Sequence, residues 1–488
     1  MRVSFPATPL QALSTLPLLA APSLISSQAL PELYSNYKAS GDSLSLFVAL
    51  LLAKRLTLYA CAATSVYVAA RRSTNVPPGL GARVEQLTAE AMFPFKYPEA
   101  EQEEFKAVVK RLDTTSDATQ AASLPLLFGA LLVGAYAFNV LIGTDQPPPA
   151  TDDAYELAAL VEAMRGTATA FQPLSTASVC LFALNAELQA FVSALLPSEA
   201  MKQRDDALSE AMNDLDEPSA TPPATLASIT FLVAVAAVGA SYLAPAAQVW
   251  PLQNTLNACI AIGVARVLQL PSLAAACAAL AGLALYDGVG TLGAASASST
   301  IASALDAATI TMAAAPQASP SVMEGVAQAR LGMGSGAGSQ LWQPGLLTVL
   351  LQGRPTDALG LGDIVGPSIL AGWAHRFDVK LEQRQQKDDF VEGTASGSGD
   401  AGDRSGKGSD GGYLAAALSG YAIGCVLLEV GPPELTRAAL LFLAPPMLIA
   451  VIARLVVTND LPLALKAPPL EPTPIDGTVE DGSNKVED

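Results

Sequence analysis

Long apolar segments recur along the chain and alternate with charged or proline-rich loops. A helix needs about 20 mostly apolar residues to cross a bilayer core, and these segments reach that length. Charged residues make up 15% of the chain, whereas soluble domains carry about 25%. The sequence therefore predicts an all-α, polytopic membrane protein with about nine transmembrane helices.

The predicted spans follow the apolar runs. They lie at residues 44–70, 124–142, within 168–196, and at 227–244, 252–270, 272–295, 356–374, 413–429 and 437–457. Lys54 and Arg55 interrupt the first run, so we expect the span itself to begin near Leu56. Their long side chains would then reach toward the membrane surface.

These spans divide the chain into six parts. We expect an N-terminal targeting or disordered segment (1–43), helices one to four with a cytosolic loop at 71–122 (44–250), helices five to seven (251–377), a disordered cytosolic linker (378–411), helices eight and nine (412–458) and a disordered acidic cytosolic tail (459–488).

Lysine and arginine are unevenly distributed between alternate loops. The loops at 71–122, at 197–222 and just after residue 374 are rich in them, whereas the opposite loops have little beyond Arg165, Arg330 and Arg354. Cytosolic loops carry the excess of basic residues, so these loops are assigned to the cytosol. The amino terminus and the connection between spans six and seven are then lumenal. The formal net charge of −18 argues against nucleic acid as a partner.

Two isolated carboxylates, Asp287 and Asp363, lie in apolar segments on consecutive spans. An ionisable residue inside the membrane usually faces a bundle interior or a cavity, and it is a candidate functional residue. Two carboxyls at one depth suggest an aspartic pair that shares a proton. Gly360 and Gly362 leave space beside Asp363. The alternatives are a buried residue that joins two helices and a proton relay in a coupled transporter.

Other kinds of site find little support. The five cysteines lie in apolar segments without metal-ligand spacing, and His375 is the only histidine. No metal or organic cofactor is therefore expected. Asp306 and Asp357, which precede Asp363 in the sequence, are interpreted as solvated loop residues rather than catalysts.

Two short motifs resemble those of a known family. Tyr286-Asp287 and Gly360-Leu361-Gly362-Asp363 are similar to the YD and GxGD motifs of intramembrane aspartic proteases, the signal peptide peptidase and presenilin group. Further stretches favour the signal peptide peptidase branch, among them Arg266–Leu273, Arg376-Phe377-Asp378 and Gly420–Gly424. The similarity covers roughly residues 116–459 and is strongest from Asn257 onward.

The resemblance implies an aspartic endopeptidase that hydrolyses peptide bonds within transmembrane helices, such as remnant signal peptides or type II membrane anchors. Asp287 and Asp363 would be its catalysts. The residues that would support them are Tyr286, Gly360, Leu361 and Gly362, with Ala439 and Leu440 in the PAL position. The implied partners are substrate helices and the bilayer, and a homo-oligomer is allowed. The endoplasmic reticulum is the family's default membrane, and an endolysosomal or plastid membrane stays open.

The chain departs from the family at the PAL motif, where Ala438 replaces the proline. Proline fixes its own φ and lacks an N–H, so its loss should let the ninth span begin earlier as regular helix. We then expect weak intrinsic activity. A protease-fold protein that is inactive and binds membrane clients remains an alternative.

The charge asymmetry makes a testable prediction about topology. A cysteine introduced near Ser335, in the connection between spans six and seven, should react with an impermeant reagent only from the lumenal side. A cysteine in the tail after residue 467 should react only from the cytosol. Labelling of sealed membrane vesicles of known orientation measures both, and the reverse pattern would overturn the assignment.

Overall fold

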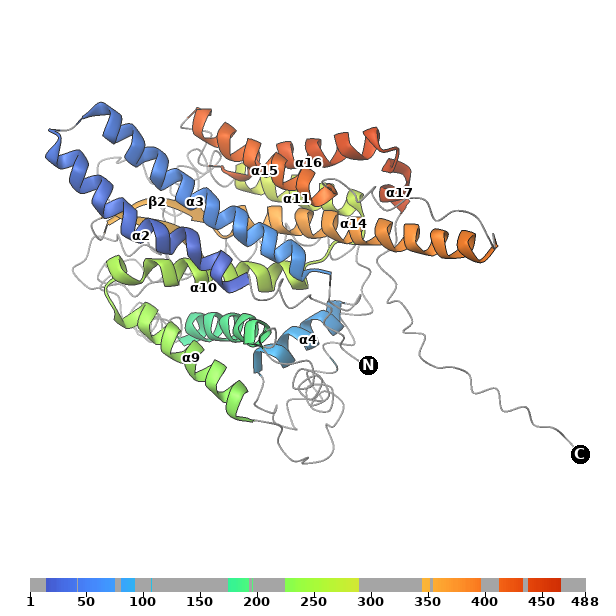
Figure 1. Cartoon of the computed structure of the whole chain (residues 1–488), viewed down its shortest axis with the longest axis horizontal. Coiled ribbons are helices and arrows are strands. Elements are labelled where there is room, and N and C mark those ends of the chain that lie inside the picture. The colour runs from blue at the N-terminus through green and yellow to red at the C-terminus, as the bar shows by residue number, and fades with distance from the viewer. Residues whose placement is uncertain are drawn as a thin grey trace, which may run out of the picture.

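The computed structural model describes residues 15–41, 43–74, 80–92, 107, 174–192, 195, 224–288, 345–351, 354–395, 412–432 and 438–466. Its labelled elements are α2 (Thr15–Ala39), α3 (Leu44–Arg72), α4 (Leu80–Met92), α9 (Ala224–Leu243), α10 (Ala246–Val267), α11 (Leu273–Gly288), β1 (Leu346–Leu351), β2 (Arg354–Gly360), α14 (Gly362–Ala395), α15 (Tyr413–Val430), α16 (Leu440–Val457) and α17 (Leu461–Lys466) (Figure 1). A further helix covers Leu174–Val192.

The described part of the chain is a helical membrane protein, as the sequence predicts. Four of its helices are long and apolar enough to cross a bilayer: Leu44–Arg72, Leu174–Val192, Tyr413–Val430 and Leu440–Val457. Ser228–Leu243 and Leu273–Leu285 are shorter apolar helices. The predicted span at 124–142 and Asp306 lie outside the described residues.

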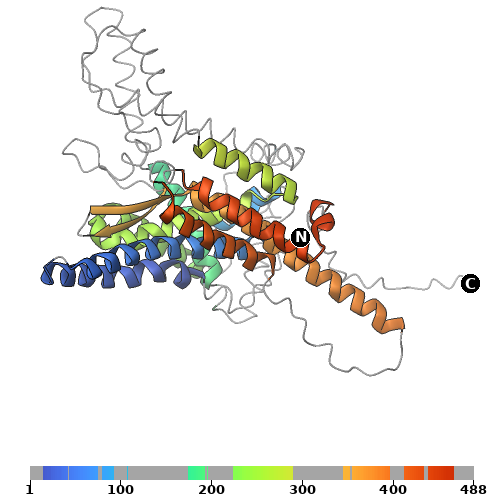
Figure 2. The same ribbon diagram turned by 90° about the horizontal axis from the view of Figure 1, so that it is seen from above.

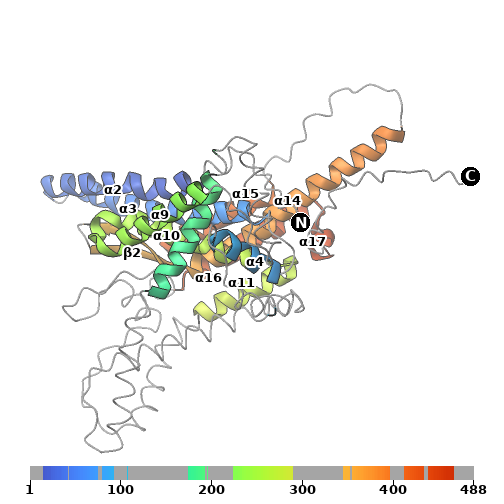
Figure 3. The same ribbon diagram turned by 90° about the horizontal axis from the view of Figure 1, so that it is seen from below.

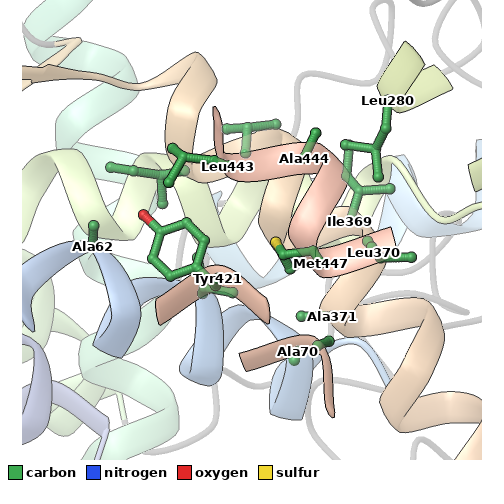
Figure 4. Packing of buried hydrophobic residues seen from close by; sticks show 14 of the residues in the cluster. Ala62, Ala70, Leu280, Ile369, Leu370, Ala371, Tyr421, Leu443, Ala444 and Met447 are labelled. Atoms are coloured by element: carbon green, nitrogen blue, oxygen red, sulfur yellow. The ribbon is translucent and has the colours of Figure 1, made fainter. Parts of the chain in front are cut away.

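α3 and α14 form the centre of the bundle. On one side α3 packs against α2, α10 and the β1–β2 hairpin, which lie together in Figure 2. On the other side α14 packs against α11, α15 and α16. One buried apolar cluster joins both sides, and Figure 4 labels ten of its members: Ala62, Ala70, Leu280, Ile369, Leu370, Ala371, Tyr421, Leu443, Ala444 and Met447. α9 and the helix at 174–192 pack on α10 around a second apolar cluster (Figure 3).

The amino-terminal segment, predicted as a targeting or disordered segment, is ordered from Thr15 to Ala39. Residues 15–39 form α2, which lies antiparallel along α3. The Ser26 and Thr57 hydroxyls are 2.6 Å apart, and Ser23 Oγ lies 3.0 Å from Cys61 Sγ. Thr15 is therefore at the same end of the bundle as Arg72. The predicted cytosolic side of Arg72 and the predicted lumenal side of the amino terminus are thus inconsistent with each other for residues 15–72.

Two further segments are more ordered than predicted. α14 continues to Ala395, so the first part of the expected linker at 378–411 is helical. Its carboxyl-terminal half projects beyond the other described helices (Figures 2 and 3). Within the expected disordered tail, Leu461–Lys466 form α17.

The predicted seventh span is the largest correction. Residues 354–360 are a strand, and α14 begins at Gly362. Asp357, interpreted as a solvated loop residue, lies on that strand with its side chain 7% exposed. It forms ion pairs with Lys54 (3.2 Å) and Arg55 (3.1 Å) of α3. These two basic side chains hold the strand on α3.

α15 and α16 pack closely together at Gly420. A Cβ atom there would lie 2.5 Å from Met447 Cα and 2.6 Å from the Pro446 carbonyl oxygen. Because small residues let helix backbones approach closely in membranes, this contact requires glycine.

Substitution of Gly420 by alanine should therefore destabilise the protein. Overpacking of a tight contact costs about 1–3 kcal/mol. Gly239 in α9 is the matched control, because its Cβ would meet no atom within 4 Å. Gly239→Ala should be neutral or slightly stabilising, since alanine is the better helix former. Thermal unfolding in detergent measures both, and equal midpoints for the two variants would contradict the contact.

Candidate active site

Asp287 lies in the last described turn of α11, with its side chain directed into the protein. It is 6% exposed. Its Oδ2 atom accepts a hydrogen bond of 3.0 Å from the backbone N–H of Leu440. Leu440 is the first residue of α16, and the first N–H groups of a helix have no partner within the helix. The start of α16 therefore supplies a donor that a residue in mid-helix could not supply.

Asp363 lies in the first turn of α14. Its Oδ2 atom accepts a hydrogen bond of 3.2 Å from the N–H of Gly360, the last residue of β2. The carboxyl group thus joins the end of the strand to the start of the helix. Leu361, between them, continues this junction: its carbonyl accepts the N–H groups of Ile364 and Val365.

Three helices bring the two carboxyl groups together. α11, α14 and α16 are in mutual contact, and the Asp287 and Asp363 carboxyls are close enough to interact electrostatically. At Gly366, one turn beyond Asp363, a Cβ atom would lie 3.3 Å from Leu440 and 3.4 Å from Leu280. The absence of a side chain at Gly366 therefore lets the helices that carry the two aspartates and the Leu440 amide pack closely.

The remaining predicted site residues lie around this pair. Tyr286 precedes Asp287 in α11, and its side chain is outside the described residues. Gly362 begins α14, is exposed, and a Cβ atom there would meet no atom within 4 Å. Ala439 is buried, and its carbonyl accepts the N–H groups of Phe442 and Leu443. The open space at Gly362 leaves room beside the Asp363 carboxyl.

Ala438 lies just before α16. The helix begins at Leu440, and Ala438 and Ala439 precede it as a bend and a turn. That the helix begins earlier here than it would with proline at residue 438 stays a prediction. The contact with Asp287 uses the backbone N–H of Leu440, which is present whether residue 438 is proline or alanine.

Sequence reasoning missed the polar groups that hold the strand before Asp363. Asn254 and Asn257 of α10 bind the backbone of β1, and Asp357 of β2 binds α3. The two asparagines are three residues apart in an apolar helix, so they share one face. Polar side chains on one face of a membrane helix indicate that this face binds another polar part of the protein, so the two asparagines could have been identified from the sequence.

No group of three or more histidine, cysteine, aspartate or glutamate side chains that could hold a metal ion occurs among the described residues. What the described residues do assemble is a buried carboxyl, Asp287, and a partly buried one, Asp363, on neighbouring helices of the bundle. That arrangement defines the class as a helical membrane protein with an acidic site between its helices.

Comparison with known families places the chain within this class. The family model for signal peptide peptidase matches residues 110–467, which is more than two thirds of the chain. The protein therefore belongs to the signal peptide peptidase family, a family of membrane-embedded peptidases. No curated protein and no solved structure matches the chain.

The two glycines beside Asp363 should respond differently to alanine. At Gly360 the added methyl would lie 3.1 Å from Asp363 Oδ2 and displace the carboxyl. Because small displacements of reacting groups cost up to about 100-fold in rate, Gly360→Ala should lower kcat by roughly 10- to 100-fold. Gly362→Ala fills open space, so it should mainly raise KM. Steady-state cleavage kinetics separate these effects, and equal losses of kcat would show that Gly360 has no special relation to Asp363.

Proposed function

We propose that the protein is an intramembrane aspartic endopeptidase in which Asp287 and Asp363 are the catalytic residues. The observation that carries the proposal is the meeting of two carboxyls, each held by one backbone N–H, within the segment that matches a peptidase family. Its substrates are transmembrane helices, such as remnant signal peptides and type II membrane anchors. Its membrane is that of the endoplasmic reticulum.

Adjacent like charges resist joint ionisation, so the two aspartates share one proton. The ionised member takes a proton from a water molecule, which attacks the scissile carbonyl. The protonated member donates a hydrogen bond to the oxygen on which negative charge develops. In the second half of the reaction the leaving amine receives a proton from the same pair. The N–H groups of Leu440 and Gly360 keep the carboxyls in place.

The substrate must present an extended backbone, because the amides of a helix are shielded by their own hydrogen bonds. β2 offers a place for it. The backbone carbonyl and N–H of Thr348 in β1 both bind Asn254, at 2.8 and 2.9 Å, so they point away from β2. In an antiparallel pair, the residue opposite such a residue also points its backbone N–H and carbonyl away from the partner strand. That residue is Ala358, which is exposed.

Ala358 therefore presents its backbone at the outer edge of β2, five residues before Asp363. Among the described residues β1 is the only strand that pairs with β2. An unwound substrate segment can add to this edge as a strand, through main-chain hydrogen bonds that do not depend on its sequence. This supports a broad substrate range limited by how readily a helix unwinds.

The alternatives gain no support. A transporter is disfavoured because both aspartates lie within the segment that matches the peptidase family. An inactive client-binding protein was suggested by the altered PAL motif. The Leu440 N–H reaches Asp287 without the motif proline, so the substitution at residue 438 removes no contact to the pair.

The proposal predicts that both carboxyls are required. Asp287→Asn and Asp363→Asn should each lower cleavage of a model type II helix by at least about 100-fold, because one carboxyl cannot act as both acid and base. Asp378→Asn on α14 is the matched control. Its carboxyl accepts the N–H groups of Tyr413 and Leu414, which an amide oxygen can also do in part.

Purified protein in lipid, with and without a transition-state isostere inhibitor, provides the assay. We expect the control to retain most of the inhibitor-sensitive activity. Substantial cleavage by either of the two aspartate variants would reject the catalytic pair.

A further inference from the structure

α10 carries two buried asparagines that bind the outer edge of β1. Asn254 Nδ2–H donates to the Thr348 carbonyl at 2.8 Å, and its Oδ1 accepts the Thr348 N–H at 2.9 Å. Asn257 Nδ2–H donates to the Leu346 carbonyl at 2.7 Å, and its Oδ1 accepts the Gly345 N–H at 2.7 Å. Each side-chain amide thus binds one donor and one acceptor of the strand.

A side-chain amide has the same donor and acceptor as a peptide group, so the two asparagines replace a neighbouring strand. Without them the edge of β1 would be buried with unpaired backbone groups, at a cost of about 1–3 kcal/mol each. Water cannot satisfy such groups in apolar surroundings. The hairpin is therefore held on α10 at a defined register, because alternate residues of a strand point to the same edge.

The hydrogen bonds of the two asparagines connect them to different parts of the site. Asn257 binds Gly345, whose carbonyl accepts the Leu361 N–H at 2.9 Å. Leu361 lies between Gly360, the donor to Asp363, and the start of α14. A chain of hydrogen bonds thus runs from Asn257 to the junction that orients the Asp363 carboxyl. Gly345 has φ +127°, which other residues rarely adopt, so the link depends on glycine there.

Asn254 acts elsewhere. It binds Thr348, which lies opposite Ala358, the residue that presents its backbone at the free edge of β2. Its Nδ2 also lies 3.2 Å from Ser23 Oγ of α2. Asn254 therefore holds the middle of the hairpin, away from the carboxyl, and connects it to the amino-terminal helix.

We propose that Asn254 and Asn257 are positioning residues with separate tasks. Asn257 sets the geometry of the Asp363 carboxyl through Gly345 and Leu361, and Asn254 sets the position of the strand edge that receives the substrate. This assignment of tasks rests on the proposed function. The hydrogen-bonded link between α10 and the hairpin can be tested without any activity.

The kinetic test compares alanine variants of the two asparagines. Asn257→Ala should lower kcat by roughly 10- to 100-fold with little change in KM, because it disturbs a reacting group. Asn254→Ala should raise KM several-fold, about as expected for the loss of one or two hydrogen bonds in binding, with a smaller effect on kcat. Asn257→Asp keeps the oxygen that accepts the Gly345 N–H, so it should recover part of the lost kcat.

Gln253→Ala is the matched control. Gln253 is also buried on α10, but its amide donates to the Ser241 carbonyl of α9 rather than to the hairpin. We expect this variant to lower the unfolding temperature while leaving kcat and KM per folded enzyme unchanged. Folded enzyme is counted by binding of the isostere inhibitor. The same kinetic change in all three alanine variants would show that the asparagines act only on stability.

Hydrogen exchange supplies the test that needs no activity. The backbone amides of residues 345–361 should exchange faster in Asn257→Ala and Asn254→Ala than in the wild type, and at the wild-type rate in Gln253→Ala. Unchanged exchange in both asparagine variants would overturn the link itself. A wild-type protein that cleaves no helix would overturn the proposed function, and the exchange result would still decide whether the asparagines hold the hairpin.

Discussion

The candidate site depends on two backbone N–H groups that have no partner within their own element and so can bind carboxyls. Leu440 N–H is free because it belongs to the first turn of α16. Gly360 N–H is free because Gly360 lies opposite Leu346 in a pair whose backbone groups point away from each other, so its N–H is directed to the outer edge of β2. A continuous membrane helix cannot offer such donors, since each of its interior N–H groups is already used. Interruptions of regular helix beside Asp363 and Asp287 are therefore what allows two carboxyls to be held in an apolar interior.

The strand before Asp363 needs its own support, because a two-stranded hairpin is marginal by itself. Polar contacts supply it from two directions. Asn254 and Asn257 bind the outer edge of β1, and Asp357 on β2 pairs with Lys54 and Arg55 of α3. In a low-dielectric interior such contacts are strong when every partner is present and costly when one is lost. The hairpin is thus fixed in position relative to α10 and α3, and with it Gly360, whose N–H binds Asp363.

The sequence predicted the helical class, the positions of most described helices and the two aspartates. It did so because each depends on local composition: apolar runs of sufficient length, and single charges inside them. It failed at residues 354–361, where a short apolar run is compatible with either helix or strand. It also failed for Asp357 and residues 15–39, whose surroundings come from segments distant in the chain.

What the sequence by itself determined is the chemistry: two carboxyls in apolar segments, glycines beside one of them, and membership of a family marked by these motifs. Only the tertiary structure decided how the carboxyls are held. The Leu440 amide reaches Asp287 across 153 positions of sequence, and Asn257 reaches Gly345 across 88. Such pairings leave little trace in a single sequence, because a backbone N–H is present at every residue except proline and becomes a specific donor only where the fold leaves it unpaired.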